Sequence, residues 1–128
     1  MTPASYSVTV DPARDLVRIR LSGFLTPENM ADFFRARNAA HRELRCGPNQ
    51  HATLADVRDM AIQAQELVHR FQSMLADPAY RSRRLAVVTP SSLVRLQAQR
   101  AAGNPNARFF SDHAEAEAWA LEPGPAQG

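Results

Sequence analysis

The chain has 128 residues, of which 45% are hydrophobic and 22% are charged, and its formal charge at pH 7 is +2. These values are typical of one globular domain, and we expect a single core over about residues 6–121 with a flexible tail at 122–128. The 15 basic residues are all arginines and are interspersed with acids, which argues against a nucleic-acid-binding surface.

Cysteine usage and the N-terminus favour a cytoplasmic protein. Cys46 is the one cysteine, so an intramolecular disulfide is excluded. The first residues have neither a basic nor an apolar signal-like segment, and no apolar run approaches the ~20 residues of a membrane span. We therefore expect no secretory signal and no membrane segment.

Two alternating segments open the chain. Residues 6–10 and 16–21 alternate apolar and polar side chains around a turn at 11–15, which predicts an antiparallel hairpin. Arg18 and Arg20 share one face of the second strand, so we expect this part of the sheet to be covered on one side only. That uncovered face is usually solvated, and a dimer surface is the alternative.

A helix and a buried strand are predicted next. Thr26-Pro27-Glu28 combines a capping threonine, a proline at the first helical position and an early acid. The helix should end near Arg45, before the breaker cluster 46–49. The segment His51–Asp59 then reads as a buried strand with three charged residues at its C-terminal end.

The second half alternates helices and strands. A helix is expected from about Ile62 to Ala76, followed by a doubly buried strand at 85–88. A helix from Ser91 to about Ala102, a short strand at 107–110 and a helix capped by Asp112 complete the chain. The order is β-β-α-β-α-β-α-β-α, and right-handed crossovers make the strands after the first one parallel to each other.

This pattern resembles the STAS or anti-anti-sigma-factor (SpoIIAA-like) family, in its divergent small bacterial branch. The resemblance is carried by the hairpin with Gly23, the Thr26-Pro27-Glu28 helix start, the strand end Leu54-Ala55-Asp56, the strand at 85–88 and the closing segment Arg108–Trp119. It implies an α/β fold with a mixed sheet, an antiparallel first strand and helices mainly on one face. It also implies binding of partners or ligands rather than catalysis.

One departure from the family pattern affects the expected regulation. Conventional anti-anti-sigma factors carry a phosphorylatable serine where the helix after the central strand begins. Here residues 59–65 read Asp-Met-Ala-Ile-Gln-Ala-Gln, without a hydroxyl. The kinase-regulated switch of the family is therefore not carried over to this chain.

Asp56, Arg58 and Asp59 are the main candidates for a binding site. Charged groups at the C-terminal end of a strand in an open sheet are well placed to bind a polar ligand or a charged group of a partner. The alternative is structural: Asp56 accepts backbone N–H bonds while Arg58 and Asp59 form a surface pair worth ~0–1 kcal/mol. Ser91 and Ser92 are a second candidate, because a strand-to-helix turn offers free N–H groups to an anion, although N-capping explains them equally.

An apolar pocket is the other candidate site. Met30, Phe34, Phe71 and Met74 are expected between two helices, where they form either core or a pocket for a lipid-like ligand. His41 is expected to face solvent and His51 to lie in a loop. The spacing of these histidines with Cys46 matches no metal motif, and no catalytic triad or cofactor motif is recognised.

These observations predict a non-enzymatic, cytoplasmic regulatory domain that binds a protein partner, with a homodimer as the expected assembly. A carrier or sensor of a small apolar ligand is the alternative. No metal, cofactor or nucleic acid is expected.

Overall fold

The computed structural model describes residues 4–47, 49–61, 63–78, 80–89 and 106–123. Its five strands form one sheet in the order β1-β2-β3-β4-β5, with β1 antiparallel to β2 and the other neighbours parallel. This confirms the predicted mixed sheet, while the helix expected from Ser91 lies outside the described residues. The elements are β1 (Ser5–Asp11), β2 (Leu16–Gly23), α1 (Pro27–His41), β3 (Ala52–Met60), α2 (Gln65–Ala76), β4 (Arg84–Val88), β5 (Ala107–Phe110) and α4 (His113–Leu121).

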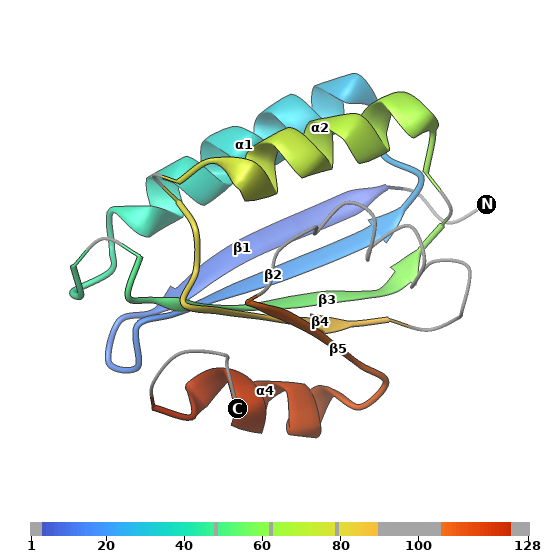
Figure 1. Cartoon of the computed structure of the whole chain (residues 1–128). Helices are drawn as coiled ribbons and strands as arrows, with labels where there is room; N and C mark the ends of the chain where they lie inside the picture. Colours follow the sequence, from blue (N-terminus) through green and yellow to red (C-terminus); the bar gives the residue numbers. More distant parts are fainter. Residues whose placement is uncertain (1–3, 48, 62, 79, 90–105, 124–128) are drawn as a thin grey trace.

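Three layers enclose two apolar clusters. Helices α1 and α2 lie side by side on one face of the sheet, and α4 lies on the other (Figure 1). The larger cluster joins the first two helices to one set of strand residues and includes Met30, Phe33 and Phe71. The smaller cluster joins α4, through Trp119, to the alternate strand residues such as Leu54. Two of the three described helices therefore share a face.

Strand β4 is buried on both faces, as its continuous apolar run predicts. Leu85 and Val87 belong to the cluster under α1 and α2. Ala86 and Val88 belong to the cluster under α4. The sequence of β4 thus predicts that both of its faces are covered.

Helix α1 begins where its sequence predicts but ends earlier. Thr26 Oγ1 accepts a hydrogen bond from the Asn29 backbone N–H at 3.1 Å, and Asn29 Oδ1 accepts one from the Thr26 N–H at 3.0 Å, which makes a reciprocal cap. The helix ends at His41 instead of near Arg45. The next N–H groups bond to carbonyls three residues back, which tightens the chain and ends the α-helical pattern.

Helix α2 begins at Gln65, three residues later than the expected start. The side chain of Gln63 is bound to backbone groups of Gly23, at the end of β2, and of Leu25, just after it, and Ala64 is extended. These tertiary bonds hold the segment out of the helix, so the amphipathic pattern overestimates its length.

Arg18 and Arg20 of β2 are both expected on an uncovered face of the sheet, but the uncovered part is smaller than that. Arg18 is half-buried and forms an ion pair with Glu117 of α4, so the last helix reaches across to this strand. Arg20, two residues further, stays exposed. The open face of the sheet is therefore concentrated around the C-terminal ends of β2 and β3.

Candidate functional site

A polar pocket of about 530 Å³ opens at this end of the sheet. Because side chains alternate along a strand, Arg20 lies on the face opposite α1 and α2, together with Leu16 of the cluster under α4. The start of β1 and the ends of β2 and β3 supply the polar lining. The polar side chains are those of Ser5, Arg20, Ser22, Arg58 and Asp59, and Phe24, just after β2, adds an apolar ring.

An extra residue in β3 brings the two carboxylates of this region to one face. Arg20 lies opposite Asp56 and Ser22 opposite Asp59, so β3 advances three residues while β2 advances two. Regular alternation from Asp56 would turn Asp59 toward the helices. The bulge returns Asp59 to the polar face, as bulges near functional sites often redirect side chains.

Asp56 and Arg58 form the more rigid of two ion pairs. Arg58 donates from Nε to Asp56 Oδ1 at 3.0 Å and from Nη2 to Oδ2 at 2.8 Å, and its backbone N–H donates to Oδ1 at 3.1 Å. Burial raises the pKa of Asp56, but the bonds from Arg58 outweigh it and leave that pKa below its ordinary value. Asp56 is thus a buried carboxylate that orients the guanidinium of Arg58.

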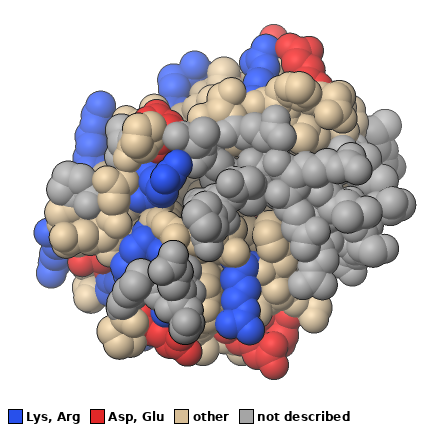
Figure 2. Space-filling model, in the orientation of Figure 1, with Lys and Arg blue, Asp and Glu red and all other residues tan. Residues whose placement is uncertain are grey.

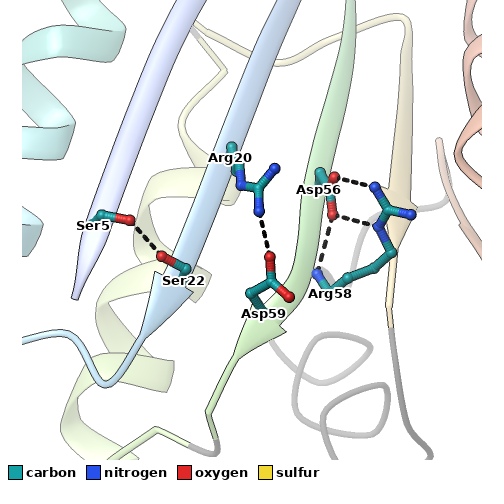
Figure 3. Close-up of polar contacts among 6 residues, drawn as sticks. All are labelled: Ser5, Arg20, Ser22, Asp56, Arg58 and Asp59. Carbon is teal, nitrogen blue, oxygen red and sulfur yellow. Dashed lines mark hydrogen bonds and ion pairs between the residues drawn. The ribbon is translucent and has the colours of Figure 1, made fainter. Parts of the chain in front are cut away.

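Arg20 and Asp59 form the second ion pair, across β2 and β3 (Figure 3). Their side chains are 57% and 56% exposed, so water screens the attraction. On the other side of Arg20, the Ser5 and Ser22 hydroxyl groups hydrogen-bond to each other. The structural alternative predicted an ion pair between Arg58 and Asp59. In the structure Arg58 pairs with Asp56, and Asp59 pairs with Arg20.

Gln63 joins the loops behind the pocket. Its Nε2 donates to the Gly23 carbonyl at 3.0 Å, and its Oε1 accepts from the Leu25 N–H at 2.9 Å. The Ala61 N–H donates to the same Gly23 carbonyl at 3.0 Å. Gly23 has a φ of 74°, a conformation that favours glycine. Phe24 follows it and is 46% exposed, so an aromatic ring lies at the edge of the polar pocket.

The residues predicted for this site fall into two groups. Asp56, Arg58 and Asp59 do lie together, and the structure adds Arg20, the two serines and Phe24, which the sequence did not single out as site residues. The one available signal was the alternation that placed Arg20 on a polar face. Ser91 and Ser92 lie outside the described residues.

The apolar candidates belong to the packed core. Met30 has no exposed surface, and Phe71 is buried in the same cluster. Phe34 and Met74 are half-buried and pack against the same cluster. The structure thus places all four in or against the larger apolar cluster, and a role as lining of a ligand pocket stays a prediction.

A second polar cluster lies between α1, β3 and the segment before β4. The His41 ring is 4.5 Å from the His51 ring and 5.0 Å from the Tyr80 ring, and the Arg37 guanidinium lies over Tyr80. The expectation that His41 faces solvent is wrong, because helix α1 turns it inward onto these rings. Burial lowers the pKa of both histidines to about 4. Among the described residues, no group of three or more acidic, histidine or cysteine side chains is arranged to hold a metal.

The described charged residues of both signs lie near one another on one face of the molecule. On the face seen in Figure 2, arginines and acids lie close to each other in several separate places. None of the described helices has the length and apolar character needed to cross a bilayer.

Comparison with known proteins agrees with this architecture. The model of a family described as SpoIIAA-like matches residues 16–121. Among solved structures, the chain is similar to the crystal structure of an uncharacterised protein from the DUF3478 family, with a SpoIIAA-like fold, from Shewanella loihica PV-4. The two are 15% identical, have a TM-score of 0.73, and the match covers 94% of this chain and 97% of that chain. No curated protein matches.

Proposed function

Because the chain belongs to the SpoIIAA-like family, we propose that it is a non-enzymatic, cytoplasmic regulatory domain that binds a protein partner through the pocket at the ends of β2 and β3. The observation that carries this proposal is the presentation of two half-exposed guanidinium groups, Arg20 and Arg58, in one open pocket. Arginine and exposed aromatic side chains are enriched where proteins bind one another.

The chemistry of the pocket supports binding over catalysis. A general base must be free to take a proton from a substrate. Asp56 is ionised and both of its oxygens accept bonds from Arg58. The other carboxylate, Asp59, is exposed and pairs with Arg20. The pocket thus offers oriented charges, and we assign it a recognition role.

Regulation in this proposal depends on the availability of the partner. Residues 59–65 lack a hydroxyl, so phosphorylation at the start of α2 has no part in it. The proposal includes a homodimer, which measurement of the molar mass in solution by light scattering tests directly.

Affinity capture tests the partner-binding role. We expect Arg20→Ala and Arg58→Ala to lower recovery of the specific partner at least about tenfold, as for arginines at the centre of an interface. Arg70→Ala is the matched control, because Arg70 is 43% exposed, compared with 44% for Arg58, and pairs with Glu66 on α2. Thermal unfolding verifies that each variant is folded. Equal recovery by wild type and both pocket variants would show that the partner binds elsewhere.

A further inference from the structure

The two ion pairs of the pocket differ in how easily a carboxylate can be exchanged. Asp56 is buried and holds Arg58 through two side-chain bonds. Asp59 is more than half exposed and contacts Arg20 through one guanidinium nitrogen, Nη2. Exposed pairs with a single contact contribute little stability, so a competing carboxylate can replace Asp59 at low energetic cost.

We propose that Asp59 occupies the position at Arg20 that an acidic side chain of the protein partner takes on binding. This inference rests on the proposed function and specifies the partner: it presents an extended acidic segment with an apolar residue next to the acid. When that segment binds, its carboxylate pairs with Arg20 and Asp59 turns out to solvent. Asp59 is therefore an internal competitor that sets the affinity.

The composition of the pocket determines the sign of the ligand. The lining includes the guanidinium groups of Arg20 and Arg58 and the carboxylate of Asp59. Because Asp56 holds Arg58 through two side-chain bonds, Arg20 is the guanidinium with which an added carboxylate can pair. Arg58 uses Nε and Nη2 for Asp56, and the Asp56 carboxylate lies between the guanidinium of Arg58 and that of Arg20 (Figure 3). The hydroxyl groups of Ser5 and Ser22 bond to each other, which leaves one O–H of the pair as a further donor. Displacement of Asp59 leaves the Arg20 guanidinium and the hydroxyl group beside it as donors, which favours binding of an anion.

Phe24 favours a peptide over a free carboxylate. Replacing one carboxylate by another at Arg20 gives almost no net attraction, so the affinity must come from additional contacts. Phe24 lines the same pocket with nearly half of its surface exposed. An apolar side chain beside the acid buries this ring, whereas a small free carboxylate does not reach it.

Fluorescence anisotropy with a defined probe tests the inference. The probe is a fluorescein-labelled hexapeptide of alternating glutamate and phenylalanine, and its control replaces each glutamate with glutamine. On the full chain, we expect Asp59→Asn to tighten binding about two- to fivefold, because the competing pair is worth little. We expect Arg20→Gln to weaken binding at least about fivefold, and added salt to weaken it in the wild type. The glutamine peptide should bind more weakly than the acidic one.

Asp32→Asn is the matched control, since Asp32 is 48% exposed, pairs with Arg35 on α1 and gives the same change in net charge. It should leave the affinity unchanged. Absence of binding to both wild type and Asp59→Asn, or unchanged or weaker binding by Asp59→Asn, overturns the inference. Displacement of the probe by free glutarate at a concentration equal to that of the unlabelled peptide overturns the peptide assignment. The capture experiment with Arg20→Ala and Arg58→Ala does not depend on these results, and it tests the proposed function separately.

Discussion

Acidification should destabilise the fold through His51. The side chain is 2% exposed, its Nε2 lies 3.2 Å from Ser82 Oγ, and its ring contacts His41. Burial lowers the pKa of His51 from 6.5 to about 4, with further lowering by His41, Arg37 and Arg83 and an opposing effect of Asp15. The folded state therefore requires a neutral ring.

The sign and size of the effect follow from proton linkage. Between pH 6.5 and 4 the unfolded chain binds a proton that the folded chain does not, so the free energy of unfolding falls as the pH falls. A shift from 6.5 to about 4 corresponds to ~3 kcal/mol in full. About 2 kcal/mol of this is lost between pH 7 and pH 5. His41 and His51 interact, so part of this loss is shared between the two rings.

Urea unfolding at pH 7, 6 and 5 measures this effect, with the fluorescence of the single tryptophan, Trp119, as the signal. We expect wild type to lose about 2 kcal/mol more than His51→Gln over this range, because the variant lacks the buried titrating ring. His69→Gln is the control, since His69 is exposed on α2. Parallel losses in wild type and His51→Gln would refute the assignment of a buried neutral imidazole.

Three further substitutions test how the site is held. Gln63→Leu removes the bonds to Gly23 and Leu25 and should lower the free energy of unfolding by about 1–3 kcal/mol, measured by urea denaturation. Gly23→Ala places a Cβ on a backbone with φ of 74° and should cost about 1–2 kcal/mol in the same assay; equal stability would show that the turn relaxes. Thr26→Ala removes the cap of α1 and should cost ~1 kcal/mol, seen as a lower melting temperature by circular dichroism.

The sequence predicts the sheet well because its strands follow local rules. Alternation marks the hairpin, and the apolar run marks β4 as buried on both faces. Helix boundaries are predicted less well where tertiary contacts override the pattern. Gln63 is the clearest case, because its side chain bonds to Gly23, the last residue of β2 and 40 residues earlier in the chain. A local pattern contains no information on that contact.

The site is predicted only in part, for a geometric reason. Asp56, Arg58 and Asp59 are adjacent in sequence, so their grouping at a strand end was accessible. The partner of Asp59 was not, because the pairing of Arg20 with Asp59 depends on the register of β2 against β3 and on the bulge. The inward position of His41 likewise depends on how α1 lies over the sheet.

The strand order of the sheet has a consequence for how the chain folds during synthesis. Spatial order equals chain order, so each strand joins the free edge left by the preceding one, and no formed pair must open to admit a later strand. A nascent chain emerging from the ribosome N-terminus first can therefore extend the sheet in one direction. Ala86 and Val88 of β4 stay uncovered on one face until α4, the last helix, is synthesised and packs on them. Between synthesis of β4 and synthesis of α4 these apolar residues lack the helix that covers them, and exposed apolar surface of this kind favours aggregation.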